Sequence, residues 1–190
     1  MEALDEPTWA LAMRLKHRCG ARWGELIALR PCDIEFEPFL RVRVHRAVEQ
    51  VGGRRAIKPT KNTQKRSSIF PASLVDLLRA HVAAVRDAVG DDALLFTLKP
   101  GEPAERRQFS RIWTRAARHA GWPMKTGTAA LWHPHDLRHV AACWMLFDVR
   151  MDPAVVSQML GHANPACTLS RYVGVRSGAD ATTNQLMGSW

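Results

Sequence analysis

The stretch His135-Asp136-Leu137-Arg138-His139 decides how this chain is interpreted. A histidine and an arginine three residues apart lie on one face of a helix, so His135 and Arg138 can address the same small anion. A pair of this kind is common by chance. Its weight therefore depends on the residues that accompany it elsewhere in the chain.

Two further segments and a single tyrosine accompany this pair. Upstream, Gly20-Ala21-Arg22-Trp23-Gly24-Glu25-Leu26 places Arg22 at the start of an expected helix, a favourable position for binding phosphate. Downstream, Leu160-Gly161-His162 places His162 in a turn between two expected helices, and the second of these carries Tyr172, the only tyrosine. Each feature taken singly is better explained as an ordinary surface or core residue.

Charge is the one unusual property of the composition. The 190 residues suit a single domain with a buried core, and the apolar content is that of a globular protein. Lysine and arginine number 27 against 18 acidic residues, a formal net charge of +9. Such a surplus favours a polyanionic partner, usually nucleic acid.

The cysteines and the apolar segments indicate a cytosolic protein. Cys19, Cys32, Cys143 and Cys167 show no paired spacing, so we expect buried, reduced thiols. The longest apolar stretch, 140–147, is too short to cross a bilayer. Acidic residues near the start argue against a secretory signal.

The patterning predicts a mainly helical α+β fold with a small basic antiparallel sheet in the N-terminal third. Strands are expected at 39–51, 54–58 and 67–70, with Gly52-Gly53 as a hairpin turn. Helices are expected at 7–19, 22–29, 73–89, 104–120 and 136–147, followed by two short ones that begin at Asp152-Pro153 and Asn164-Pro165 and end at Gly161 and Gly174.

Together and in this order, the quoted segments resemble the tyrosine recombinases of the phage integrase family. The resemblance runs over nearly the whole chain. It implies the tyrosine-recombinase catalytic-domain fold, with residues 1–190 forming one catalytic domain. It also implies that the N-terminal core-binding domain, which embraces the other side of the DNA in full-length members, is absent from this chain.

Carried over by position, the family's catalytic roles fall on six residues. Tyr172 would be the nucleophile that forms a 3′-phosphotyrosine bond. Arg22 and Arg138 would clamp the non-bridging oxygens of the scissile phosphate, and His162 would add a hydrogen bond to it. His135 would help to handle the tyrosine proton. The general acid that protonates the departing 5′ oxygen would be Lys61.

The lysine assignment has two rivals, and three acidic residues are expected to be structural. Thr60-Lys61-Asn62 best matches the family's Thr-Lys-Thr pattern, Lys58 is the main alternative, and Lys65 matches a basic pair that follows the motif. We expect Glu25 and Asp33 to orient Arg22 or to cap a turn, and Asp136 to cap the helix that holds Arg138.

The resemblance implies a site-specific recombinase that cleaves and rejoins double-stranded DNA in integration or excision, with no cofactor or metal. The HExxH glutamate is absent, and no fourth ligand accompanies His135, His139 and Cys143, so we expect no zinc site. The alternatives are a type IB topoisomerase-like enzyme that reseals the same strand and a non-catalytic DNA-binding fragment. We expect a homo-oligomer (a tetramer) on DNA, with a monomer as the alternative when the protein is free, and no membrane partner. We also expect a phage or mobile-element origin and action in the cytoplasm of a prokaryotic host, at the nucleoid when active.

Overall fold

The computed structural model describes residues 6–51, 54–67, 70, 72–125 and 131–161. The chain divides into two compact units, residues 1–141 and 142–190, and each is described by itself. No helix within the described ranges is long and apolar enough to cross a membrane. Residues 162–190, with the expected helix at 164–174, lie outside the described residues.

The first unit is built around a three-stranded antiparallel sheet. Its strands are β1 (Ile34–Glu35), β2 (Arg41–Val51) and β3 (Arg54–Ser67), in the order β1-β2-β3. Its helices are α1 (Glu6–Cys19), α2 (Trp23–Leu26), α3 (Ala72–Val89) and α4 (Arg106–His119). A 3₁₀ turn (Pro31–Asp33) and a short hairpin of β4 (Thr97–Lys99) and β5 (Glu102–Pro103) complete it, and α5 (Asp136–Cys143) begins in it.

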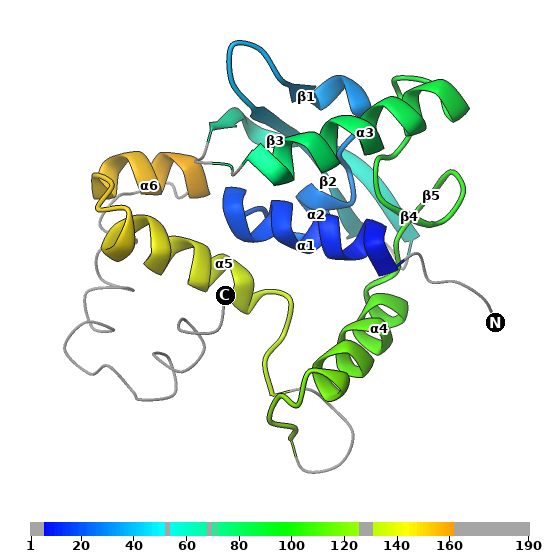
Figure 1. Ribbon diagram of the computed structural model, residues 1–190. Helices are drawn as coiled ribbons and strands as arrows, with labels where there is room; N and C mark the ends of the chain where they lie inside the picture. The colour runs from blue at the N-terminus through cyan, green and yellow to red at the C-terminus, as the bar shows by residue number, and fades with distance from the viewer. Residues whose placement is uncertain (1–5, 52–53, 68–69, 71, 126–130, 162–190) are drawn as a thin grey trace. The chain divides into compact units, whose positions relative to one another are not determined.

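The core lies where α1 and α3 pack against each other over the sheet (Figure 1). Leu15 of α1, Leu78 of α3 and Val42 of β2 are completely buried there. Alternation places Val42 and Val44 inward and basic side chains on the other face of β2, as the sequence predicts. The mainly helical α+β class is confirmed, and helices α1, α3 and α4 lie within two residues of their predicted bounds.

Aromatic rings join α4 to the N-terminal helices. The ring of Phe109 in α4 lies 4.8 Å from that of Trp9 and 4.6 Å from that of Trp23. Phe109 is 2% exposed, so its burial contributes roughly 2–3 kcal/mol to folding. This contact fixes α4 beside α1 and α2 within the first unit.

The second strand of the hairpin corrects the sequence prediction. Strands were predicted at 54–58 and 67–70, but β3 is one strand from Arg54 to Ser67. The segment between them has no apolar alternation, and its pairing is supplied by β2 instead. Pro59 is tolerated because β3 is an edge strand, where one missing N–H does not interrupt the sheet.

The short helix after Gly20 is also shorter than predicted. It was expected over 22–29, but α2 covers Trp23–Leu26. Ala28 and Leu29 then donate to the carbonyls three residues earlier, at 3.2 and 3.3 Å, so the chain tightens into turns before Pro31.

One cysteine prediction is wrong. Cys19 and Cys143 are buried as expected, but Cys32 is exposed. It lies in the turn Pro31–Asp33, whose two outer residues are buried, so the middle side chain points to solvent. Cys167 lies outside the described residues.

The described part of the second unit is a π-helical turn (Trp144–Asp148) and α6 (Pro153–Leu160). The predicted signals of α6 are confirmed: the Asp152 carboxylate accepts the Ala154 N–H at 2.7 Å, and Gly161 ends the helix at φ 70°. The helix predicted over 136–147 is α-helical only to Cys143 and continues as the π-helical turn.

Gly24 provides a test of how α2 packs on the sheet. A Cβ atom built on Gly24 would lie 2.5 Å from the backbone oxygen of Val48 in β2, and α2 contacts that strand. We predict that Gly24→Ala lowers the free energy of unfolding by roughly 2–3 kcal/mol, because the backbones must separate. Denaturant unfolding followed by circular dichroism measures this.

The matched control is Gly121→Ala. A Cβ atom there meets nothing within 4 Å, and the only strain is a positive φ of 71°. We expect a loss of about 1 kcal/mol. Equal losses at both glycines would contradict the close approach of α2 to β2.

Candidate active site

The first site residue, Arg22, is held by a neighbouring carboxylate. Both oxygens of Glu25 are used: Oε2 accepts the Arg22 backbone N–H at 2.6 Å, and Oε1 pairs with Nη1 of the Arg22 side chain at 3.0 Å. The Glu25 side chain is 4% exposed, whereas that of Arg22 is 49% exposed. The arginine is therefore anchored by Glu25 while its side chain stays half exposed, and orienting Arg22 is one of the two structural roles predicted for Glu25.

The turn before Arg22 reverses the chain at Gly20. Gly20 has φ 61° and donates its N–H to the Lys16 carbonyl at 2.8 Å, which ends α1. Arg22 then adopts an extended conformation and serves as the N-cap of α2. The turn places the arginine side chain at the start of that helix.

The second arginine, Arg138, donates a hydrogen bond to the same turn. Arg138 of α5 is 4% exposed, and its Nη1 donates to the Gly20 carbonyl at 2.6 Å. A hydrogen bond from a charged group is stronger than one between neutral groups. Arg22 and Arg138, which are 116 positions apart, are thus brought to one turn.

Lys16 is a third cation at this turn, and our sequence analysis did not identify it. Its side chain is completely buried, and its Nζ donates to the Ala21 carbonyl at 2.6 Å. The sequence carried a signal, because Lys16 interrupts the buried stripe of Ala12, Leu15 and Cys19 on α1. Lysine is almost never fully buried unless it is paired, so a lysine on the apolar side of a helix indicates a specific partner.

His135 lies just before α5, in the electrostatic field of these cations. Partial burial lowers its pKa below the ordinary value of 6.5, and the charges of Lys16, His139 and Arg138 lower it further, against an opposing effect of Asp136. Its imidazole is therefore neutral at pH 7 and able to accept a proton. Its ring contacts that of His139 edge to face, at 5.3 Å between centroids.

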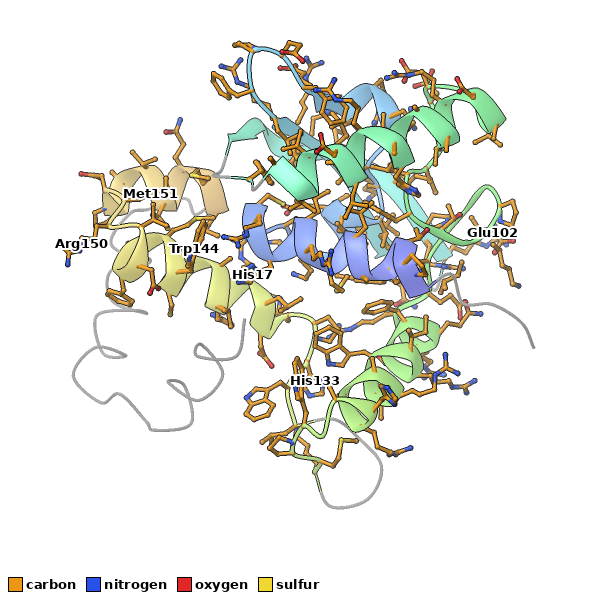
Figure 2. The ribbon with its side chains drawn as sticks, in the orientation of Figure 1. His17, Glu102, His133, Trp144, Arg150 and Met151 are labelled. Carbon is orange, nitrogen blue, oxygen red and sulfur yellow. The ribbon has the colours of Figure 1, made fainter. Side chains whose placement is uncertain are left out.

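Asp33 has a role that was predicted for it, whereas Asp136 has a different one. Asp33 accepts the Arg30 backbone N–H at 3.0 Å, which caps the turn and is one of the two structural roles predicted for it, and it pairs with Arg46 at 2.6 Å. Asp136 was expected to cap α5, but it is the first residue of the helix, and its carboxylate accepts the His133 N–H at 2.7 Å. It closes the turn that leads into α5 at the position labelled His133 in Figure 2.

The candidate general acids lie on β3, around an irregularity in the hairpin. Arg46 pairs with Pro59 and Val44 with Gln64, so between these pairs β2 has only residue 45 and β3 has residues 60–63. Lys61 lies in that widened segment, while Lys58 is paired with Ala47 and is exposed. The side chains of Lys61 and Lys65 are not among those described.

Three of the six predicted catalytic residues are therefore located in one region: Arg22, His135 and Arg138. His162 and Tyr172 lie outside the described residues, and for Lys61 only the backbone position is given. In the described part of the chain, no group of three or more histidine, cysteine or acidic side chains could hold a metal ion.

An arginine anchored by Glu25, a second arginine bonded to the same turn and a histidine with a lowered pKa lie together in a mainly helical α+β fold. The chain belongs to the Phage integrase family, which it matches over residues 2–178. This confirms the family that the sequence motifs indicated.

Among curated proteins, the chain is similar to a XerC-like tyrosine recombinase of Caldanaerobacter subterraneus, at 28% identity over 88% of this chain and 46% of that protein. It is also similar to the tyrosine recombinase XerC of Chromobacterium violaceum, at 31% identity over 81% of this chain and 44% of that protein. The chain spans less than half the length of these relatives.

Solved structures show the same fold. The Tn1549 transposon integrase in complex with transposon right end DNA matches with a TM-score of 0.69 at 19% identity, over 90% of this chain and 56% of that one. The XerH site-specific recombinase bound to a palindromic difH substrate matches with a TM-score of 0.65 at 20% identity, over 100% of this chain and 47% of that one. The predicted tyrosine-recombinase catalytic-domain fold is thus confirmed.

The charges around His135 make a prediction for its titration. A nearby positive charge disfavours protonation, so removing the Lys16 charge should raise the pKa of His135 toward its ordinary value. We predict an upward shift in Lys16→Met, measured by NMR titration of the histidine ring protons. Arg14→Met, which removes an exposed cation from the same helix, should leave the titration unchanged. An identical His135 midpoint in wild type and Lys16→Met would refute the coupling.

Proposed function

We propose that this chain is the catalytic part of a site-specific DNA recombinase, which cleaves and rejoins strands through a 3′-phosphotyrosine at Tyr172. The observation that carries the proposal is the half-exposed Arg22 fixed by Glu25 at the turn that Arg138 supports. Family membership and the relatives described as tyrosine recombinases support it. Residues 1–190 would act as one catalytic domain.

The proposed role of the two arginines follows from the charge of the substrate. A phosphodiester is already negative, and a phenolate that attacks it is repelled unless that charge is neutralised. Two guanidinium groups aimed at the non-bridging oxygens stabilise the pentacoordinate transition state, where negative charge accumulates. Arg22 presents a half-exposed side chain for this role, whereas Arg138 is buried against the Gly20 carbonyl and adds positive charge to the same turn.

The proton transfers complete a balanced reaction. The phenol of a free tyrosine has a pKa of about 10, so Tyr172 needs a base or a cationic field to react at neutral pH. In the proposed step its oxygen bonds to phosphorus, its proton passes toward the neutral His135, and the bond to the 5′ oxygen breaks. Lys61 gives the departing oxygen its proton, with Lys58 and Lys65 as alternatives. His162 hydrogen-bonds the phosphate, and attack by a 5′ hydroxyl reverses the step.

The described surface offers a basic face for double-stranded DNA. Arg106, Arg107 and Arg111 of α4 are exposed, and with Gln50 and Ser110 they line a surface hollow of about 500 Å³. Contacts of arginine with phosphates would position the duplex without reading its sequence. The Tn1549 integrase and XerH structures contain DNA, which supports the same partner here.

The remaining expectations concern assembly and location. We propose that copies of the chain form a tetramer on recombination sites, because exchange between two duplexes requires four strand cleavages. We also propose that it acts in the bacterial cytoplasm, on nucleoid or mobile-element DNA, since that is where its substrate would be. No cofactor is needed, because the phosphotyrosine bond conserves the energy of the phosphodiester.

Covalent capture of DNA tests the proposed function. We predict that nicked suicide duplexes with a randomised centre form a DNA–protein adduct with wild type, in the presence of a chelator, and none with Tyr172→Phe. A denaturing gel detects the adduct, and sequencing the captured DNA gives a preferred site. Noncovalent binding to that site should be nearly the same in both proteins, because the missing hydroxyl carries the chemistry and not the affinity.

Two results would reject the assignment. An adduct formed equally well by Tyr172→Phe would mean that another side chain is the nucleophile. Tight binding of a selected site by wild type, with no adduct from any nicked duplex, would indicate a DNA-binding role without catalysis.

A further inference from the structure

Lys16 is a buried lysine that the proposed reaction does not use. Its side chain is completely buried, as are Ala12, Leu15 and Cys19 of the same helix. Burying an ammonium group opposes folding unless hydrogen bonds and charges compensate. The neighbouring His17, labelled on α1 in Figure 2, adds no charge at pH 7, because burial and Arg18 lower its pKa to about 4.

The hydrogen bond of Lys16 falls on the peptide group that precedes Arg22. The carbonyl of that group, Ala21 O, accepts from Lys16 Nζ at 2.6 Å. Its N–H, which belongs to Arg22, donates to Glu25 Oε2 at 2.6 Å. One peptide plane is therefore held at both ends by charged side chains. Rotation of that plane would turn the Arg22 Cα–Cβ bond away from its present direction.

The preceding carbonyl is held in the same way. Gly20 O accepts from the buried Arg138 at 2.6 Å, so two successive carbonyls of this turn each receive a hydrogen bond from a buried cation. These two hydrogen bonds orient the Gly20 and Ala21 carbonyls toward the cations and so stabilise a turn in which the Arg22 side chain is half exposed. The same two cations place positive charge at the turn that carries Arg22.

We propose that Lys16 is a positioning residue for Arg22. It fixes the carbonyl end of the Ala21–Arg22 peptide, as Glu25 fixes the N–H end, and thereby orients the guanidinium toward the scissile phosphate. This inference rests on the proposed function of the chain. An apolar side chain at position 16 would pack in the helix stripe but would leave the Ala21 carbonyl without this donor. We therefore expect such a variant to fold, with an Arg22 side chain that is no longer held in one direction.

The experiment compares Lys16→Met, Lys16→Gln and the control Arg14→Met with wild type. Methionine removes both the charge and the donor, glutamine keeps an N–H donor without the charge, and Arg14 is an exposed cation on the same helix. The DNA is the nicked duplex of the captured site, prepared with an ordinary scissile phosphate or with a methylphosphonate. The measured quantities are the single-turnover rate of adduct formation, the affinity in a Tyr172→Phe background, and the melting temperature.

We expect Lys16→Met to form adduct roughly 10- to 100-fold more slowly on the phosphate substrate, with DNA affinity changed less than about threefold. A methylphosphonate lacks the negative charge that Arg22 would neutralise, so the deficit of Lys16→Met on it should shrink by at least about fivefold. Lys16→Gln should recover part of the rate, and Arg14→Met should equal wild type. A role in folding alone would lower the melting temperature without distinguishing the two substrates.

Two outcomes would overturn the inference. One is a Lys16→Met rate within about twofold of wild type on the phosphate. Another is an equal deficit on phosphate and methylphosphonate. If Lys16→Met does not fold, Lys16→Leu, which also removes both the charge and the donor, takes its place in both comparisons and is judged by the same criteria. Absence of any adduct with wild type would reject the proposed function itself, whereas a normal wild-type adduct with a normal Lys16 variant would reject only the positioning role.

Discussion

The arrangement of the candidate site depends on a single peptide group, the one between Ala21 and Arg22. Its oxygen accepts from Lys16 and its N–H donates to Glu25, so its plane is defined from two directions. Charged donors and acceptors make these hydrogen bonds stronger than ordinary backbone ones. Because the peptide is fixed, Arg22 can be half exposed and still have a defined direction, which a surface arginine on a flexible turn would not have.

The rest of the first unit serves to bring the donors of this turn together. Helix α1 supplies Lys16 from its buried side, and its packing on α3 and the sheet keeps that side facing inward. Helix α2 supplies Glu25 and lies so close to β2 that Gly24 has no room for a side chain. Arg138 reaches the same turn from α5, 116 positions further along the chain. The site is therefore a product of tertiary packing, although its parts are local motifs.

Sequence reasoning found those parts that depend on residue type and spacing. The motif around Arg22 and Glu25 and the His135–Arg138 pair were identified from short patterns, because each is a group of residue types only a few positions apart. Lys16 was missed, since its partner is a backbone carbonyl, and no pattern of side chains marks a carbonyl as an acceptor. The two predicted strands in place of β3 were wrong for a related reason: the polar segment has no strand pattern of its own and is ordered by pairing with β2.

The edge strand of the sheet, β3, affects whether copies of the protein associate with one another through their sheets. An open strand edge offers its amides to any similar strand, which is a route to aggregation between molecules. β3 forms this edge, and it carries the exposed Lys58 and, beside it, Pro59, which has no amide hydrogen to offer. Like charges and the missing donor discourage a second β3 from adding to the sheet. Copies of the protein can thus be crowded together at high local concentration and remain separate molecules.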